Sequence, residues 1–254
     1  MKQSNNGVYK HIIFDLFGVL FAVNKLSVSH HIGLFDAAFY MLRYRRSPLD
    51  LALSVLDKIA KNQDYQDCIL QYKNYFLPQY VHDFNRGLRS SQETICETQY
   101  EIEKLATQNY FTSDLEKKIA TNVLKIFFTP DLIVKAADPV KEVIDIVKQV
   151  KKNHDVFLLS NIDTESISLL QANYVDVFSL FDGIVLSCEA QLLKPDHAIF
   201  KHVTDRYQLK PKECIFIDDQ KENIEAAQSF GIHSILFRNA RGVKNELREL
   251  DIGI

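Results

Sequence analysis

The chain has 254 residues, of which 46% are hydrophobic and 25% are charged, and its formal net charge is −3 at pH 7. This composition is that of an ordinary globular protein with enough apolar residues for one large domain or two smaller ones. The net charge is slightly negative, so the chain has no excess of positive charge with which to bind nucleic acid, and we expect no nucleic-acid partner.

Two features bear on the compartment of the protein. The apolar run at residues 12–23 is too short to cross a bilayer, which takes about 20 apolar residues, and no small-residue cleavage site follows it. The cysteines are far apart and form neither a CxxC pair nor a zinc-ligand pattern, which favours unpaired thiols in a reducing environment. They are Cys68, Cys96, Cys188 and Cys214. We therefore predict a cytoplasmic protein with no membrane partner.

In chain order, the first predicted element is a buried strand at residues 12–14, followed by Asp15. Residues 25–137 then show a helical pattern throughout, with apolar residues three and four positions apart. Two helix starts in this stretch are marked by N-cap serines, Ser47 and Ser113. No strand is predicted there, so the pattern indicates an all-helical domain.

From Asp138 onward, short apolar runs rich in β-branched residues alternate with amphipathic helices, which is typical of a parallel sheet with crossover helices. Asp138 and Pro139 predict the N-cap and first turn of the first of these helices. The later predicted strands are 156–159, 183–186, 214–217 and 233–237, and the helices are 164–173, 195–207, 222–230 and a tail around 245–250.

The isolated first strand would have unpaired edges, so we expect it to complete the later sheet. The helical stretch is then an insertion. The predicted fold class is α/β, with a Rossmann-like core whose parallel sheet is flanked by helices, plus an inserted all-helical cap domain. The predicted core is discontinuous and consists of residues 1–24 and 138–254, and the predicted cap consists of residues 25–137.

Polar residues follow the predicted core strands, at the edge where open parallel sheets bind ligands. Carboxylate oxygens are the ligands that magnesium prefers, while a lysine and a hydroxyl group hold phosphate oxygens. A metal ion would also offset the repulsion among clustered carboxylates. The residues are Asp15, Ser160, Asn161, Lys194, Asp218, Asp219 and Asn223. Each alone fits a turn or a helix cap, but together they predict a site for magnesium and phosphate.

Four motifs in this order resemble those of the haloacid dehalogenase superfamily. They are residues 14–20 (FDLFGVL), 159–161 (LSN), 193–196 (LKPD) and 216–219 (FIDD), the last followed by Asn223. The resemblance covers roughly residues 8–22 and 138–240, and the helical insertion lies where subfamily I members carry a type-1 cap. In its motifs the chain is most similar to sugar-phosphatase-like members and to the N-terminal phosphatase-like part of epoxide hydrolases.

The resemblance implies a hydrolase that acts on a small phosphorylated metabolite. Asp15 would attack phosphorus and form an aspartyl-phosphate, which water then hydrolyses. Ser160 and Asn161 would bind the substrate. Lys194 would also bind it and would offset charge on the nucleophile and the phosphoryl group.

The resemblance also implies Mg²⁺ as cofactor. The ion would be held by Asp15, Asp219 and the backbone carbonyl of Phe17, with Asp218 and Asn223 in support. A backbone carbonyl needs no particular side chain, so the phenylalanine at this position is compatible with metal binding.

Phe17 nevertheless departs from the family pattern. Phosphatases of this family usually carry at this position a second aspartate, which protonates the leaving group and activates water. General acid–base help is typically worth about 10² to 10⁴ in rate. Three outcomes are open: a substrate with a good leaving group, a proton supplied by a cap residue or by the substrate, or a site that binds ligands without turnover.

An aromatic residue at position 17 also resembles the dehalogenase branch, which carries a tyrosine there. That branch needs no metal and lacks an acidic pair like Asp218 and Asp219, so phosphate chemistry is favoured. The prediction is therefore a magnesium-dependent phosphatase. The alternatives are a 2-haloacid dehalogenase-like hydrolase and a catalytically silent binding protein of the same fold. The sequence predicts no oligomeric state.

Overall fold

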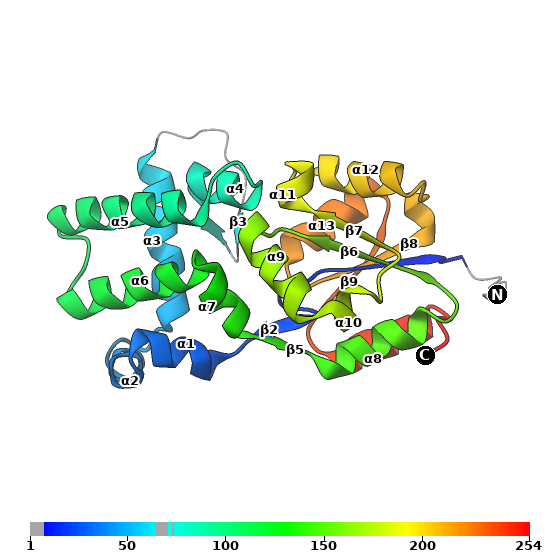
Figure 1. Ribbon diagram of the computed structural model, residues 1–254, viewed down its shortest axis with the longest axis horizontal. Helices are drawn as coiled ribbons and strands as arrows, with labels where there is room; N and C mark the ends of the chain where they lie inside the picture. Colours follow the sequence, from blue (N-terminus) through cyan, green and yellow to red (C-terminus); the bar gives the residue numbers. More distant parts are fainter. Residues whose placement is uncertain (1–7, 64–70, 73) are drawn as a thin grey trace. The chain divides into compact units, whose positions relative to one another are not determined.

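The computed structural model describes residues 8–63, 71–72 and 74–254 of the chain. It divides into two compact units, each described by itself below (Figure 1). The α/β unit comprises residues 1–22 and 138–254, within the described ranges, and the helical unit comprises residues 23–137. The predicted division into a core of residues 1–24 and 138–254 and a cap of residues 25–137 stays a prediction.

The α/β unit is built on a five-stranded parallel sheet with the order β7-β6-β1-β8-β9. The strands are β1 (His11–Phe14), β6 (Asp155–Ser160), β7 (Gly183–Leu186), β8 (Cys214–Asp218) and β9 (His233–Leu236). The first strand lies at the centre, between β6 and β8, so it completes the later sheet as predicted. Its residues Ile12, Ile13 and Phe14 are fully buried, as expected where both faces are covered by helices. The predicted α/β fold class is confirmed.

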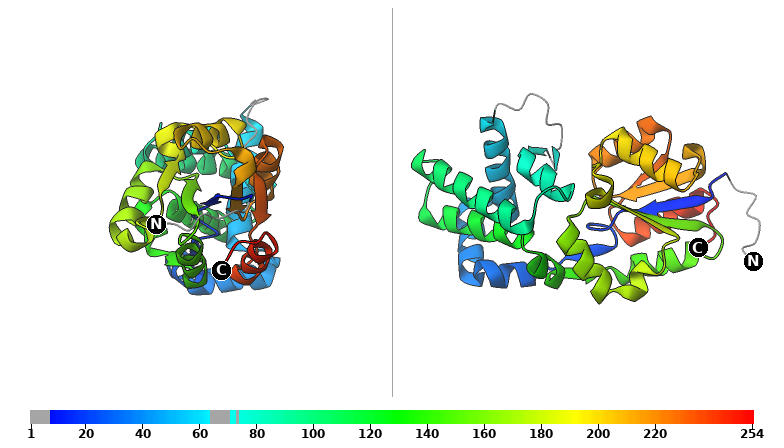
Figure 2. Two further views of the ribbon diagram at one scale, coloured as in Figure 1. Left: turned by 90° about the vertical axis from the view of Figure 1, so that its right-hand side faces the viewer. Right: turned by 45° about the horizontal axis from the view of Figure 1, so that its top comes forward.

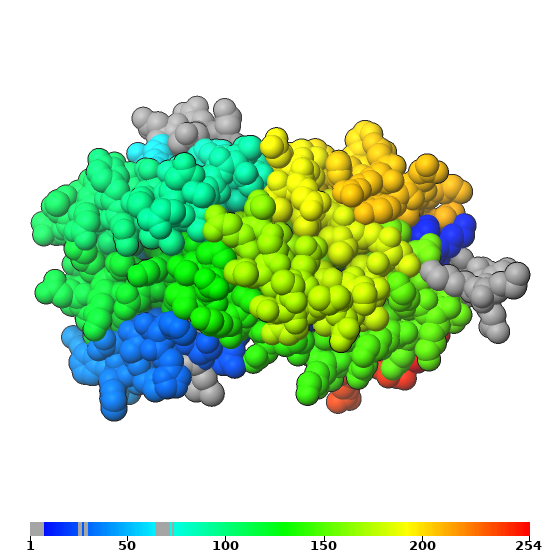
Figure 3. Space-filling model, viewed as in Figure 1, coloured from blue at the N-terminus to red at the C-terminus, as the bar shows by residue number. Residues whose placement is uncertain are grey.

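Helices cover both faces of this sheet (Figure 2). Helices α12 and α13 pack on one face through apolar side chains that include Ile13, Phe200 and Phe216, and α8 and α14 lie on the other. In the space-filling view, the yellow and orange residues around α12 form part of the molecular surface on the α12 side of the sheet (Figure 3). The helices are α8 (Lys141–Val150), α9 (Thr164–Asn173), α10 (Val175–Phe178), α11 (Ser187–Ala190), α12 (His197–Arg206), α13 (Lys221–Phe230) and α14 (Ala240–Glu249), with a 3-10 turn at Pro211–Glu213.

The prediction that Asp138 and Pro139 begin a helix is wrong. Both residues lie in β5 (Ala137–Pro139), which pairs with β2 (Phe21–Val23) in a two-stranded sheet. Helix α8 begins at Lys141, and the N–H of the preceding valine donates to a backbone carbonyl just before β2 at 2.9 Å. Proline suits both a first helical turn and the edge of a strand, and pairing with β2 decides between them here.

The helical unit has its own apolar core, which includes the buried residues Tyr40, Ile59 and Ile119. The predicted helix starts are confirmed: Ser47 accepts the Asp50 N–H at 3.0 Å, and Ser113 caps α6 in the same way. The helices are α1 (Lys25–Ile32), α2 (Leu34–Tyr44), α3 (Pro48–Asn62), α4 (Gln79–Asn85), α5 (Ser91–Thr107), α6 (Asp114–Phe127) and α7 (Pro130–Lys135).

The helical unit also contains a small antiparallel hairpin, which corrects the prediction that this stretch has no strand. Its strands are β3 (Gln71–Tyr72) and β4 (Tyr75–Phe76). The Phe76 N–H donates to the Asp57 carboxylate of α3 at 2.9 Å, which anchors the hairpin to that helix. Strands of two residues are too short to show an alternating pattern, so only the tertiary contact identifies them.

Two observations bear on the predicted compartment. None of the described helices has the length and apolar character needed to cross a membrane. Cys96, Cys188 and Cys214 are free thiols, and Cys68 lies outside the described residues. The cytoplasmic location stays a prediction.

Candidate active site

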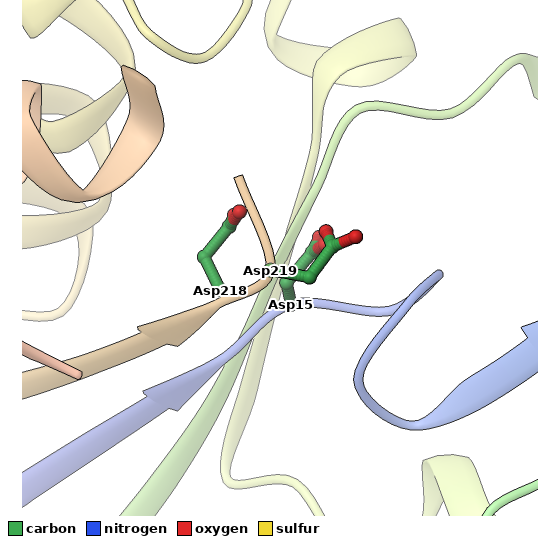
Figure 4. A group of neighbouring side chains, drawn as sticks. All are labelled: Asp15, Asp218 and Asp219. Carbon is green, nitrogen blue, oxygen red and sulfur yellow. The ribbon is translucent and has the colours of Figure 1, made fainter. Parts of the chain in front are cut away.

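The candidate site lies at the edge of the sheet where the carboxyl ends of β1, β6 and β8 meet. Asp15 directly follows β1, Ser160 is the last residue of β6, and Asp218 is the last residue of β8, with Asp219 next in the chain. The Asp15 N–H donates to the carbonyl of Ile217 at 2.9 Å, so the ladder between β1 and β8 continues to this point. Figure 4 shows the three aspartates together at these strand ends.

Lys194 connects the carboxylates of this cluster. Its Nζ donates to Asp15 Oδ1 at 2.5 Å, to Asp218 Oδ2 at 2.7 Å and to the Leu159 carbonyl at 3.0 Å. The side chain is 1% exposed, so an ammonium group with three donors is buried among three acceptors. Burial by itself lowers the pKa of Lys194, but the charges of Asp15 and Asp218 outweigh it and raise the pKa above its ordinary value.

Asn161 holds the loop that carries this lysine. Its Nδ2 donates to the Lys194 carbonyl at 2.8 Å, and its Oδ1 accepts the Lys194 N–H at 2.9 Å. The amide side chain thus bonds both polar backbone groups of Lys194. The sequence predicted substrate binding for Asn161 and did not anticipate this contact, because the two residues are 33 positions apart.

Asp218 is fixed by donors from several elements. Asn223, in the first turn of α13, donates to both carboxylate oxygens at 3.0 Å, and the Gln220 N–H donates to Oδ1 at 2.8 Å. Together with Lys194, these groups surround a carboxylate that is fully buried. Asp218 is therefore oriented by the protein on both of its oxygens.

Gly18 makes room for the carboxylate of Asp219. The glycine has φ +89°, and a Cβ built on it would lie 2.5 Å from the Cγ of Asp219. Any side chain at this position would therefore collide with the carboxylate, in a backbone conformation that favours glycine. The sequence motif contains Gly18, but only the structure shows that this glycine lies against the carboxylate of Asp219.

Phe17 lies in the same tight turn. Its backbone pairs with Phe21, its ring centroid is 6.4 Å from that of Phe21, and the next residue's N–H donates to the Phe21 carbonyl at 2.8 Å. The ring is half-buried. The turn therefore holds the backbone of Phe17 firmly and offers a hydrocarbon side chain two residues after Asp15.

The chemistry of the donor set fits a divalent cation. Oxygens of Asp15, Asp218 and Asp219 all lie within 4.8 Å of one another, which within the described part of the chain is the single group of three or more potential metal-ligating side chains. Three carboxylates beside one lysine leave an excess of negative charge, and hard oxygen ligands suit magnesium. Burial raises the pKa of Asp15 to about 7, against the lowering effect of Lys194 and with a further raising effect of Asp218. A bound cation would favour the ionised carboxyl.

Comparison with curated proteins finds partial matches. The rat (Rattus norvegicus) bifunctional epoxide hydrolase 2 is 30% identical over 88 residues, which are 35% of this chain and 16% of that protein. The sesquiterpene phosphatase astK of Aspergillus oryzae is 32% identical over 95 residues, 37% of this chain and 48% of that protein. The matches thus span less than half the length of these relatives.

Comparison with solved structures finds the same fold over nearly the whole chain. A HAD-like family hydrolase from Porphyromonas gingivalis aligns with a TM-score of 0.56 and 19% identity over 95% of this chain and 98% of that one. A HAD family enzyme from Bacteroides thetaiotaomicron, a variant solved in complex with magnesium and inorganic phosphate, aligns with a TM-score of 0.53 and 19% identity over 91% and 94%. A dehalogenase with an intermediate complex aligns with a TM-score of 0.56 and 15% identity over 92% and 87%.

The family assignment rests on sequence as well as on fold. Residues 9–231 match the haloacid dehalogenase-like hydrolases, a range that includes the first strand, the helical insertion and every residue of the cluster described above. The chain therefore belongs to the haloacid dehalogenase-like hydrolase family.

Proposed function

We propose that the protein is a magnesium-dependent phosphatase that acts on a small phosphorylated metabolite, with Asp15 as nucleophile. The observation that carries this proposal is the contact of Lys194 with Asp15 and Asp218, beside a third carboxylate, that of Asp219, at the end of the sheet. Three neighbouring carboxylates, two of them buried, are costly unless cations offset their charge, and a phosphatase site supplies both a cation and a use for the charge.

In the proposed reaction, an oxygen of Asp15 attacks phosphorus while the bond to the leaving oxygen breaks. The hydrogen bond from Lys194 to Oδ1 leaves Oδ2 for the attack. Lys194 offsets charge on the attacking carboxylate and on the phosphoryl group, and the Ser160 hydroxyl donates to a phosphoryl oxygen. Asn161 acts as a positioning residue, because it holds the backbone of Lys194.

Asp15, Asp219 and the backbone carbonyl of Phe17 would hold the magnesium ion, with Asp218 and Asn223 in support. When bound, the ion would neutralise the carboxylates and withdraw charge from the phosphoryl group. Asp218, fixed by Lys194 and Asn223, keeps the lysine oriented toward the nucleophile. The structurally similar enzyme solved with magnesium and inorganic phosphate and the matched sesquiterpene phosphatase support this proposal.

A 2-haloacid dehalogenase-like hydrolase is the second candidate, since a dehalogenase shares the fold and Phe17 is aromatic. Dehalogenation would also use Asp15 as nucleophile, but a halide leaves as an anion and needs no metal. The acidic pair Asp218 and Asp219 has no evident use in that reaction, so the cluster favours phosphate chemistry.

The test is a panel of phosphate monoesters and anhydrides, and 2-chloropropionate, assayed on the full chain with and without magnesium. We expect magnesium-dependent phosphate release that Asp15→Asn abolishes, together with the loss of a phosphorylated Asp15 peptide in the mass spectrum. Asp145→Asn, an exposed aspartate of α8, is the matched control and should retain activity. Metal-independent chloride release would favour the dehalogenase, and no turnover of any compound would leave a silent binding protein.

A further inference from the structure

The leaving oxygen of a phosphate ester must receive a proton unless it departs as a stable anion. Among the described residues around Asp15, the charged side chains already have other partners: Lys194 directs its three N–H donors at Asp15, Asp218 and the Leu159 carbonyl. Asp15 itself is the proposed nucleophile, and Asp218 accepts hydrogen bonds on both oxygens. Asp219 belongs to the carboxylate cluster that the proposed cation would occupy. These groups hold no proton placed for a leaving group.

The turn that follows Asp15 supplies no proton either. Its residues Leu16, Val19, Leu20 and Phe21 are fully buried hydrocarbon. Only Phe17 and Gly18 reach the surface of the turn, and neither side chain carries an acidic hydrogen. The side of the site formed by this turn is therefore apolar.

Among the described residues of the α/β unit, Asp163 is a rival proton donor, because it follows β6 three residues after Ser160 and burial raises its pKa. Its Oδ1 accepts the Ser166 N–H at 2.8 Å and so caps α9, and the residue is 5% exposed. An N-cap carboxylate acts as an acceptor for the helix terminus, which accounts for Asp163 without a role in proton transfer.

We propose that the site selects phosphoryl donors whose leaving group departs as a stable anion, namely acyl phosphates and phosphoanhydrides, over phosphate esters of aliphatic alcohols. This inference rests on the proposed function. A carboxyl group has a pKa of about 4 and a phosphate a second pKa of about 6, so both leave as anions at neutral pH. An aliphatic alcohol is about as weak an acid as water, with a pKa of about 16, and departs slowly without a proton.

With such donors, both steps of the reaction can be completed without a general acid. In the first step an Asp15 oxygen bonds to phosphorus, and the electron pair of the breaking P–O bond goes to the carboxylate or phosphate that leaves. In the second step water attacks the phosphorus of the aspartyl-phosphate, Asp15 leaves as a carboxylate, and the proton of the water goes to the released phosphate or to solvent. The second leaving group is itself a stable anion, so the same site serves both steps.

The experiment measures kcat/KM with magnesium for acetyl phosphate, inorganic pyrophosphate, a series of aryl phosphates of graded phenol acidity, and glycerol phosphate. We expect kcat/KM along the aryl series to fall steeply, by roughly tenfold for each unit of phenol pKa, and glycerol phosphate to be turned over least. A shallow dependence in the parent protein, with glycerol phosphate turned over as fast as acetyl phosphate, would overturn the inference while leaving the proposed function intact. No turnover and no phosphorylated Asp15 with any donor would overturn both.

Three variants sharpen the test. Phe17→Asp adds a carboxyl group to the apolar turn and should raise kcat/KM for glycerol phosphate by about 10² or more, with little gain on acetyl phosphate. Phe17→Leu is the matched control and should keep the steep dependence. Asp163→Asn should also leave the dependence unchanged; if it makes a shallow dependence steep, Asp163 is the acid and the inference is wrong. The dependence of kcat/KM on phenol pKa in the parent protein tests the inference even if Phe17→Asp does not fold.

Discussion

At the scale of single residues, Lys194 combines a structural and a proposed chemical function. Removing it would leave Asp15 and Asp218 buried without their cation, so we expect Lys194→Met to lower the free energy of unfolding by about 3 kcal/mol or more. Urea denaturation of the metal-free protein measures this. Lys201→Met, which removes a lysine 67% exposed on α12, should change it by less than about 1 kcal/mol. Equal stability of the two variants would contradict this view of the cluster.

Gly18 tests the geometry of Asp219. We expect Gly18→Ala to displace the Asp219 carboxylate, to weaken magnesium binding by tenfold or more in calorimetric titration, and to destabilise the protein by about 1 to 3 kcal/mol through its positive φ. Gly253→Ala is the control, because a Cβ there meets nothing within 4 Å. Unchanged magnesium affinity in Gly18→Ala would mean that Asp219 does not hold the ion.

At the scale of elements, helix α4 carries a pH-sensitive group in the helical unit. His82 is 3% exposed, and burial, reinforced by the charge of Arg86, lowers its pKa from 6.5 to about 4. Between these values the unfolded chain binds a proton that the folded protein does not, so stability is present above pH 6.5 and is lost as the pH falls toward 4.

The loss amounts to at most about 3 kcal/mol over this interval. We expect His82→Gln to flatten the pH dependence of the free energy of unfolding between pH 4 and 6.5, while His30→Gln, at an exposed position, leaves it unchanged. Parallel profiles for His82→Gln and the parent protein would show that His82 does not cause the acid sensitivity.

The helices and strands also show when a local sequence signal is sufficient to predict the start of a helix. Ser47 and Ser113 begin helices as predicted, because an N-cap hydroxyl bonds an N–H only three residues away. Asp138 and Pro139 carry a similar signal and form a strand, because β2 lies beside them. A local pattern therefore decides a helix terminus only where no distant strand competes for the same backbone groups.

At the scale of the whole molecule, the two units have separate apolar cores and are joined by adjacent passages of the chain. The Asn24 N–H donates to the Ala136 carbonyl at 2.7 Å, so the ends of the helical insertion are neighbours. We expect a protein in which residues 25–135 are replaced by a short glycine-serine linker to unfold cooperatively and to bind magnesium with an affinity within about tenfold of the parent.

Circular dichroism measures the cooperativity of unfolding, and calorimetric titration measures the magnesium affinity. The control is the same deletion protein carrying Asp219→Asn, which should keep the fold and lose magnesium binding. A deletion protein without a cooperative transition would contradict the predicted independence of the α/β domain. Loss of turnover on larger substrates, with magnesium binding kept, would place substrate selection in the helical unit.

The α/β fold class and the position of the first strand follow from local patterns, because buried parallel strands must be apolar on both faces and a lone strand must find partners. The residues of the candidate site can be predicted from the sequence for a related reason. Asp15, Ser160 and Asp218 each lie next to such a strand end, and parallel strands bring these ends to one edge.

The contacts within that edge depend on distances that no sequence pattern encodes. Lys194 lies 179 positions from Asp15 and 24 from Asp218, and its three hydrogen bonds exist because a loop held by Asn161 directs it inward. The space that Gly18 leaves for a carboxylate likewise arises from two chain segments about 200 residues apart. Hydrogen bonding and steric exclusion act over a few ångströms, so folding must first bring these segments together before either effect selects a residue.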